Sequence, residues 1–332
     1  MPEIRYNLIT RQWVIIATER ARRPEEFGKK GKEAKEIPAF IETCPFCPGN
    51  EDKTPAHLVA IPAEGQWQVR VIPNKFSALA REGPLTRSIS GIKRSMSGVG
   101  LHDVVIETPD HSKTTALLAE KDVETIFEAY RRRYAAMDAD DRIEQITIFK
   151  NHGEAAGTSL EHPHSQIIGT PVIPVDVRDR LEGALHHYDQ TGECLFCRML
   201  ELEIKEGARV VEETEHFAWF VPYAALTPFH SWIFPKQHRA SFAEASDAEM
   251  TDLARFLRRS LRRIYKGLDN PDFNYTIRTA PRESGNVRYY HWYLSIVLRL
   301  TKLAGFELGS GMFINVALPE ASAKFLRDTS PD

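Results

Sequence analysis

The sequence has few cysteines, no excess of charge of one sign and no long apolar run. Its 332 residues include four cysteines, and 43 basic residues nearly balance 46 acidic ones, which leaves a formal net charge of −3. A chain so close to neutral has no general electrostatic attraction to nucleic acid or to an anionic membrane. Even the apolar stretch 217–234 contains two prolines and a histidine, so we expect no bilayer-spanning helix. We therefore expect neither nucleic acid nor membrane among the partners.

The N-terminus also lacks the features of a secretory signal. Glu3 and Arg5 carry charge where such a signal has an apolar run. The simplest expectation is a cytoplasmic protein, in which thiols stay reduced. Hydrophobic residues make up 42% and charged residues 27% of the chain, which is the ordinary balance of a soluble globular protein. The chain is long for one domain and can bury a sizeable core.

The cysteines that are present form two pairs of identical spacing, Cys44-Pro-Phe-Cys47 and Cys194-Leu-Phe-Cys197. In the cytoplasm, Cys-x-x-Cys is either a redox dithiol or half of a metal site. A redox pair normally begins a helix after a strand, whereas residues 48–50, Pro-Gly-Asn, are typical of a loop. The loop chemistry favours metal binding over redox chemistry.

One stretch, residues 151–166, combines a glycine-rich loop with a histidine-rich strand. Its two glycines allow the backbone to come close to a ligand. His162, His164 and Gln166 would project from one face, because alternate side chains of a strand share a face. Two imidazoles and an amide beside such a loop are typical of a phosphate site with a nucleophile. Taken alone, the motif leaves open a strand with two incidental histidines.

From residue 173 onward, the chain repeats the pattern of its first 172 residues. Each part has a cysteine pair, strands of matching order and an amphipathic helix, around residues 123–130 and 250–264. We predict an α+β fold of two histidine-triad-like halves, residues 1–172 and 173–332, each a mainly antiparallel sheet with flanking helices. Residues 81–100 contain glycines and scattered charge, and we expect a loop there.

Each predicted half offers two cysteines and two histidines. The two histidines are 51 positions apart in the first half and 53 in the second. Two thiolates and two imidazoles suit tetrahedral Zn2+, and four protein ligands leave no open position, which is typical of a structural site. The predicted ligands are Cys44, Cys47, His111 and His162 in the first half, and Cys194, Cys197, His238 and His291 in the second. Buried thiols with unrelated histidines are the alternative interpretation.

These motifs resemble the galactose-1-phosphate uridylyltransferase family of the histidine-triad superfamily, over nearly the whole chain. The matching segments are Arg5-Tyr6-Asn7, Arg20-Ala21-x-Arg23-Pro24, Cys44-Pro-Phe-Cys47, Pro109-Asp110-His111, Asn151-x-Gly153-x-x-x-Gly157-x-Ser159 and His162-Pro163-His164-x-Gln166. The resemblance implies two duplicated halves around an extended sheet, a homodimer, and transfer of a nucleotidyl group.

The resemblance also assigns roles by position. It implies that His164 is the nucleophile that takes up a nucleotidyl group, and that Gln166 bonds the transferred phosphoryl group. The implied substrate contacts are Arg20 and Arg23 to a phosphate or sugar phosphate, Asn74 and Phe76 to the nucleoside, and Asn151, Gly157 and Ser159 to nucleotide and phosphate. In the second half, Tyr293 stands in the nucleophile position, so that half is expected to keep its metal site without the chemistry.

The residue types at 164 and 166 suit such a transfer. An imidazole with an ordinary pKa of about 6.5 is largely neutral at pH 7 and nucleophilic without a separate base. A sugar 1-phosphate leaves as a stable dianion, since the second pKa of a phosphate monoester is about 6. An amide such as that of Gln166 can stabilise charge on oxygen but cannot transfer a proton.

The sequence favours UDP-glucose:hexose-1-phosphate (galactose-1-phosphate) uridylyltransferase activity. Lys75, in place of a commonly acidic residue, and the second cysteine pair resemble the ADP-glucose phosphorylase-like branch. A nucleotide-sugar phosphorylase that uses phosphate as acceptor is therefore the alternative. A zinc-stabilised nucleotide-binding protein without turnover is a third hypothesis, and it would not need His164 beside an amide. The expected small-molecule partners are a UDP-sugar or ADP-sugar and a hexose 1-phosphate.

Overall fold

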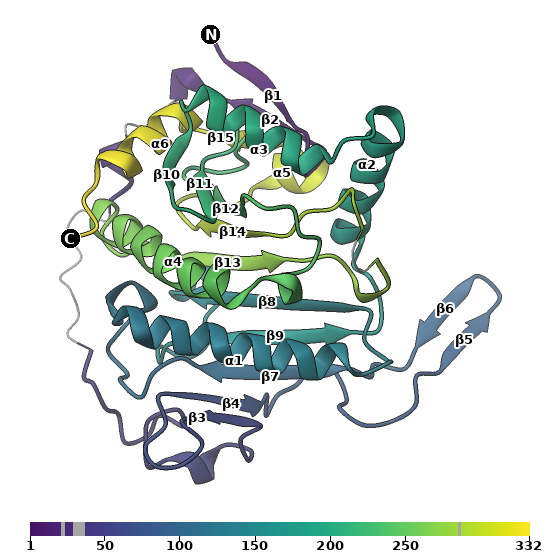
Figure 1. The fold of residues 1–332 in the computed structure, drawn as a ribbon, viewed down its shortest axis with the longest axis vertical. Coiled ribbons are helices and arrows are strands. Elements are labelled where there is room, and N and C mark those ends of the chain that lie inside the picture. Colours follow the sequence, from purple (N-terminus) through teal and green to yellow (C-terminus); the bar gives the residue numbers. More distant parts are fainter. Residues whose placement is uncertain (21–23, 29–36, 285–286) are drawn as a thin grey trace.

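The computed structural model describes residues 1–20, 24–28, 37–284 and 287–332 and shows one wide sheet with helices packed against it (Figure 1). The strands are β1 (Glu3–Asn7), β2 (Gln12–Ile16), β3 (Val59–Ile61), β4 (Val69–Pro73), β5 (Arg87–Ser90), β6 (Lys93–Met96), β7 (Leu101–Ile106), β8 (Gln145–His152), β9 (His164–Thr170), β10 (Val210–Glu213), β11 (Phe217–Phe220), β12 (Ser231–Pro235), β13 (Phe273–Arg278), β14 (Tyr293–Leu298) and β15 (Phe313–Asn315). The α-helices are α1 (Glu120–Asp138), α2 (Val175–Thr191), α3 (Leu195–Glu206), α4 (Asp247–Gly267), α5 (Gly305–Ser310) and α6 (Pro319–Asp328).

The main sheet is ten-stranded, in the order β10-β11-β12-β14-β13-β8-β9-β7-β4-β3. Every neighbouring pair in it is antiparallel. The order is symmetric about the pairing of β8 with β13, so each half contributes five strands in matching positions. This arrangement confirms the predicted α+β fold with duplicated halves. The predicted division between residues 172 and 173 falls in the connection between β9 and α2.

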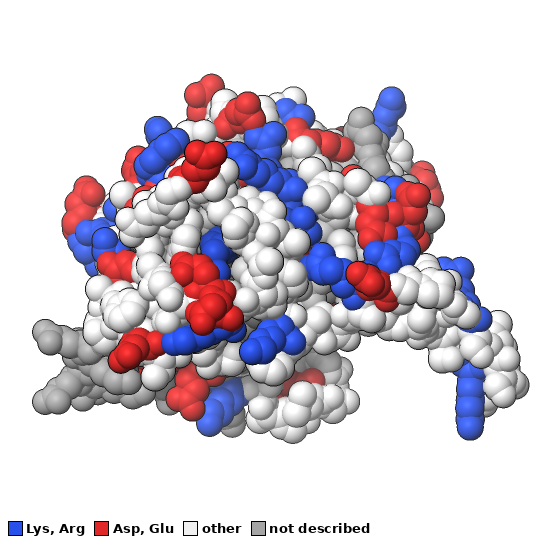
Figure 2. All heavy atoms as spheres, turned by 90° about the horizontal axis from the view of Figure 1, so that it is seen from below, with Lys and Arg blue, Asp and Glu red and all other residues white. Residues whose placement is uncertain are grey.

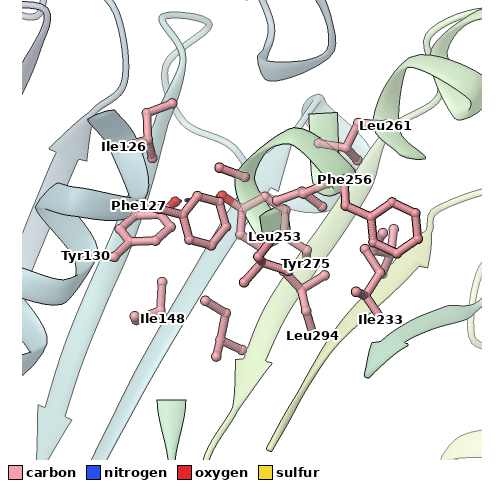
Figure 3. Packing of buried hydrophobic residues seen from close by; sticks show 14 of the residues in the cluster. Ile126, Phe127, Tyr130, Ile148, Ile233, Leu253, Phe256, Leu261, Tyr275 and Leu294 are labelled. Atoms are coloured by element: carbon pink, nitrogen blue, oxygen red, sulfur yellow. Dashed lines mark hydrogen bonds between the residues drawn. The ribbon is translucent and has the colours of Figure 1, made fainter. Parts of the chain in front are cut away.

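Helices α1 and α4 occupy equivalent places and cover the same face of the sheet (Figures 1 and 3). In α1, apolar residues recur every three or four positions, which gives the helix one buried stripe. The side chain of Ser246 caps α4 by accepting the N–H of Glu249, as the first turn of a helix requires. Figure 3 shows Phe127 and Leu253 of the two helices above Ile148 and Tyr275 of the central strands. Both helices were predicted from their periodicity and are confirmed.

The opposite face of the sheet is covered differently in the two halves. Over the second half, α2 and α3 pack on an aromatic cluster that includes Trp232, Phe234 and Tyr293. Over the first half, a smaller cluster joins the loop that carries Cys44 and Phe46 to strands β4 and β7. The first half therefore keeps part of this face uncovered, and the cavities described below lie there.

Residues 87–96 form a projecting β-hairpin, β5–β6, and the prediction of a loop there was wrong. Gly91, with a φ of 60°, provides the two-residue turn. A half-buried strand is recognised by alternating apolar and polar residues. The hairpin lacks this alternation because neither of its faces is covered by the body of the molecule. Figure 2 shows the hairpin standing away from the body with basic side chains along it, while charges of both signs are interspersed on the rest of this face.

Strands β1, β2 and β15 form a separate small sheet, in which β15 runs parallel to β2. Within the described part of the chain, no helix combines the length and the apolar character needed to cross a bilayer.

Candidate active site

His164 begins β9 and is 7% exposed. Its Nδ1–H donates to the backbone carbonyl of His162 at 2.8 Å, which leaves the lone pair of the ring on Nε2. Burial lowers the pKa of His164, and this effect outweighs the hydrogen bond to the His162 carbonyl, which raises it. The ring is therefore neutral at pH 7 and has a nitrogen available for nucleophilic attack.

Two adjoining cavities meet at His164. The first, of about 550 Å³, has apolar walls that include Ile72 and Val104 and also contains the predicted residues Asn74, Phe76, Ser159 and Gln166. The second, of about 380 Å³, runs along the glycine-rich loop and contains the predicted residue Asn151. Ser159 and His164 line both cavities. An apolar recess beside a loop of exposed backbone suits a nucleoside joined to phosphate.

The loop between β8 and β9 has a shape that requires glycine. Gly153 has a φ of 83°, and a Cβ built there would lie 2.3 Å from the carboxylate of Asp272. That carboxylate accepts the N–H of Ala155 at 2.7 Å, which holds the loop in place. Gly157 also has a positive φ, of 84°, but it does not line either cavity, so its predicted ligand contact stays a prediction.

The two predicted phosphate-binding arginines are not placed by the structure. Arg23 lies outside the described residues. Of Arg20 only the backbone is described, at the end of a short 3-10 helix, Thr18–Arg20. Lys75, the residue that departs from the uridylyltransferase pattern, is exposed and lines the larger cavity.

The structure adds three residues around His164 that the sequence did not single out. The Phe46 ring lies edge-on to the His164 ring, with centroids 5.5 Å apart. His102 is bonded to Gln166, and Lys150 donates to the His164 carbonyl at 3.2 Å. The only signal for Phe46 was its place inside the first cysteine motif. His102 and Lys150 gave none, because their partners lie on other strands and the contacts depend on how the strands pair.

A buried ion pair lies directly behind the nucleophile. The Lys150 ammonium donates to Glu107 Oε2 at 2.6 Å, and neither residue is more than 1% exposed. Thr115 donates a further hydrogen bond to this carboxylate at 2.9 Å. Burial alone would raise the pKa of Glu107, but Lys150 and the hydrogen bonds bring it below its ordinary value. Glu107 is therefore ionised and depends on Lys150 for compensation.

Lys150→Met should lower the free energy of unfolding by about 3–5 kcal/mol, because it leaves a buried carboxylate without its counter-charge. The double variant Glu107→Gln/Lys150→Met should be less destabilised than the single variant, since it removes both charges together. Urea denaturation of the three proteins measures the difference. Equal losses in the single and double variants would show that the ion pair does not act as a pair.

The first predicted metal site is assembled from separate segments. Cys44, Cys47, His111 and His162 are all buried, and their ligand atoms all lie within 4.8 Å of one another. The His162 Nδ1 atom is 3.7 Å from Cys44 Sγ, 3.6 Å from Cys47 Sγ and 3.2 Å from His111 Nδ1. In tetrahedral zinc sites, bond lengths of about 2.3 Å to sulfur and 2.0 Å to nitrogen put sulfur and nitrogen ligands about 3.5 Å apart. The donor atoms therefore fit zinc.

The partner of the other ring nitrogen supports the same assignment. His162 Nε2–H donates to the Thr108 carbonyl at 2.8 Å, which leaves Nδ1 unprotonated toward the two thiols. Burial lowers the pKa of His162 to about 4, so the ring stays neutral, as a metal ligand must. A metal at this site would hold the residue whose carbonyl orients His164.

The second predicted site is less enclosed. Cys194, Cys197 and His238 lie within 4.8 Å of one another, half-buried beside a hollow of about 380 Å³. His291 joins them through Cys197, with its Nδ1 3.5 Å from Cys197 Sγ. Unlike the first pair, this cysteine pair begins a helix, because Cys194 is the N-cap of α3. The two nearby imidazoles distinguish it from a simple redox dithiol.

Among the described residues of the second half, aromatic side chains occupy the place that corresponds to His164 and its cavity. Tyr293 occupies the position of His164, and its ring stacks on Phe234 with centroids 4.6 Å apart. Ser295 occupies the position of Gln166 and pairs with Trp232 across the sheet. Aromatic side chains thus fill the space that the first half leaves open.

Duplicated α+β halves and a histidine strand beside a glycine-rich loop place the protein in the histidine-triad class. Within that class, the sequence profile of the galactose-1-phosphate uridyl transferase N-terminal domain matches residues 1–174, and that of the C-terminal domain matches residues 181–326. The chain therefore belongs to the galactose-1-phosphate uridylyltransferase family, as the motifs predicted. It is an enzyme of the nucleotidyltransferase type.

Both an ADP-glucose phosphorylase and uridylyltransferases resemble the chain over almost its full length. An ADP-glucose phosphorylase from Arabidopsis thaliana is 37% identical over 99% of this chain and 93% of its own. A galactose-1-phosphate uridylyltransferase from Thermotoga maritima is 29% identical over 99% of each chain. The crystal structure of an Arabidopsis ADP-glucose phosphorylase with bound ADP-glucose superposes with a TM-score of 0.84 at 34% identity, over 99% of each chain. A uridylyltransferase structure gives 0.76 at 27% identity, over 99% of this chain and 98% of that one.

Proposed function

We propose that the enzyme transfers a nucleoside monophosphate from a nucleotide sugar to a phosphate-containing acceptor through a nucleotidyl-His164 intermediate. The observation that carries this proposal is the neutral His164 ring, whose Nδ1–H is held by the His162 carbonyl while Nε2 has no hydrogen-bond partner among the described residues. Gln166 stands beside it, in the same cavity.

In the first step, the lone pair of His164 Nε2 forms a bond to the α-phosphorus of the nucleotide sugar. The bond from that phosphorus to the bridging oxygen breaks, and the sugar 1-phosphate leaves with the electron pair as a dianion. The imidazole becomes positively charged while it keeps its Nδ1–H, so its hydrogen bond to the His162 carbonyl strengthens. In the second step, an acceptor phosphate oxygen attacks the same phosphorus and the neutral ring leaves. Neither step requires a proton transfer.

We further propose that the donor is an ADP-sugar and that the acceptor is phosphate, as in an ADP-glucose phosphorylase. The support is the higher identity to the ADP-glucose phosphorylase, 37% against 29% for the uridylyltransferase, and the higher TM-score, 0.84 against 0.76. Lys75 and the second cysteine pair, which resemble the ADP-glucose phosphorylase-like branch, also favour this proposal. The UDP-glucose:hexose-1-phosphate transfer that the sequence favoured is the second candidate, supported by the family.

A labelling panel decides between the two donors. The purified enzyme is mixed with ADP-, UDP- or GDP-glucose labelled at the α-phosphorus, quenched in base and tested for protein-bound label. ADP-glucose should label fastest, and phosphate should discharge the label as ADP faster than galactose 1-phosphate discharges it. Preferential labelling by UDP-glucose, with discharge by galactose 1-phosphate, would identify the uridylyltransferase instead. No label from any donor would contradict the covalent mechanism.

Zinc at both Cys/His clusters, in a structural role, is part of the same proposal. The donor distances at the first cluster support it. Zinc would fix the segments that carry its ligands and would take no part in the transfer. Arg20 and Arg23 as phosphate contacts, and a cytoplasmic homodimer, remain predictions from the sequence.

A further inference from the structure

We propose that His102 is a positioning residue that sets which end of the Gln166 amide faces the transferred phosphoryl group. The inference rests on the proposed function. On β7, His102 stands two residues before Val104, which is paired with Gln166, so the two side chains share the face that carries the cavity. His102 Nε2 lies 2.7 Å from Gln166 Oε1, and the ring is 8% exposed.

The hydrogen bonds of the His102 ring determine its tautomer. Its Nδ1 accepts the backbone N–H of Ala78 at 3.3 Å. A backbone N–H can only donate, so Nδ1 holds the lone pair, and the hydrogen of the neutral ring is on Nε2. Nε2–H therefore donates to Gln166 Oε1.

This bond leaves the Gln166 NH2 group for the ligand. Among the described residues, His102 is the only hydrogen-bond partner of the Gln166 side chain. A phosphoryl oxygen that gains negative charge is stabilised by the NH2 end of an amide and repelled by its oxygen. Without His102, nothing in the described structure would prevent the amide from turning its oxygen toward the phosphoryl group.

Asn74 completes the arrangement around the ring. Its Nδ2 lies 3.0 Å from His102 Nε2, and its Oδ1 accepts the N–H of Phe76 at 2.9 Å. Two groups thus compete for Nε2, an amide nitrogen and the Gln166 oxygen. The shorter contact, to Gln166, and the donor at Nδ1 both favour a hydrogen on Nε2. The opposite tautomer would place two N–H groups against each other at Ala78. In the Nε2–H tautomer, the Asn74 NH2 group lies beside Nε2–H and donates no hydrogen bond to the ring.

The second half contains a natural comparison for this histidine. His230 occupies the position of His102, and its Nε2 lies 3.1 Å from Ser295, which replaces Gln166. His230 is buried, and Trp232 donates a hydrogen bond to its Nε2 at 3.0 Å. At the equivalent places among the described residues, this half has Ser295 in place of the amide and Tyr293 in place of the nucleophile. His230 therefore has no amide to orient, and its role is structural. In the first half, by contrast, the equivalent His102 is bonded to Gln166, which lines the cavity.

Two substitutions separate the donor from the shape of the ring. His102→Gln keeps an N–H donor near the position of Nε2, whereas His102→Met has similar bulk and no donor. In single-turnover labelling with the nucleotide sugar, His102→Met should lower the rate constant by up to about 10²-fold, the size of one lost oxyanion donor. The concentration of nucleotide sugar that gives half the maximal labelling rate should not change. His102→Gln should restore the rate constant to within a few-fold of the original enzyme.

A double-mutant cycle with Gln166→Ala tests whether His102 acts through the amide. In the Gln166→Ala enzyme, adding His102→Met should change the rate constant by less than about twofold, because the group that His102 orients is gone. If His102→Met lowered the labelling rate constant equally in the original enzyme and in the Gln166→Ala enzyme, the proposal would be overturned. His230→Met serves as the structural comparison, and it should lower the thermal midpoint more than His102→Met while affecting the labelling rate constant less.

The tautomer can be measured without any turnover. In protein labelled with ¹⁵N-histidine, the His102 signals are those that disappear in His102→Gln, and their nitrogen shifts report which atom carries hydrogen. We expect the Nε2–H form. The Nδ1–H form would overturn the proposal whatever the enzyme transfers. Failure of every nucleotide sugar to label the protein would instead contradict the proposed function, and the tautomer would still decide the geometry around Gln166.

Discussion

Replacing His164 by asparagine should abolish the covalent intermediate and lower the rate of transfer on the order of 10⁶-fold, as loss of a nucleophile does in other covalent enzymes. Asparagine cannot form the phosphorus–nitrogen bond that the mechanism needs. The fold should survive, because the ring borders two cavities and has one hydrogen bond, to the His162 carbonyl. The measurement is the burst of sugar 1-phosphate on mixing with the labelled donor, together with the label retained on the protein.

Tyr293→Phe is the matched control for this prediction, since Tyr293 has the equivalent place in the second half. It should keep both the burst and the label, because aromatic packing rather than its hydroxyl defines its role. A label mapped to any second-half residue would refute the assignment, as would full turnover by His164→Asn. Transfer without any label in the original enzyme would indicate direct displacement in a ternary complex.

Loss of the first metal site should have the second largest effect. Cys44→Ser should reduce the zinc content from about two to about one per chain and lower the thermal midpoint, because the binding energy of a structural zinc is also folding energy. Labelling should fall as well. His162 is a ligand of this site, and its backbone carbonyl holds the Nδ1–H of His164. Metal analysis, thermal denaturation and the labelling assay measure the three effects.

Cys194→Ser is the corresponding change at the second site and provides the control. It should also remove one zinc and lower the midpoint, but the folded protein should still be labelled at His164, since this cluster lies in the other half of the sheet. If both variants lost labelling to the same extent at equal stability, the proposed link between the first metal and the nucleophile would be wrong. Metal-free protein with full stability would contradict both sites.

Much of the fold could be predicted from local patterns. The apolar spacing in residues 123–130 and 250–264 predicted α1 and α4, because a helix that covers a sheet needs one apolar stripe. The two cysteine pairs with histidines at similar intervals predicted both the duplication and the ligand sets, and the first set is brought together completely. Alternation predicted that His164 and Gln166 would share a face, and both line one cavity.

The sequence by itself therefore determined the duplicated α+β fold, the family, and the candidate catalytic and metal-binding residues. Tertiary structure decided which half has an open cavity, because α2 and α3 cover one half and a short loop covers the other. It also decided the partners of the reactive residues: His102 for Gln166, and the Lys150–Glu107 pair behind His164. Periodicity and motif spacing are local properties of the chain, whereas these contacts join strands whose pairing depends on the whole sheet.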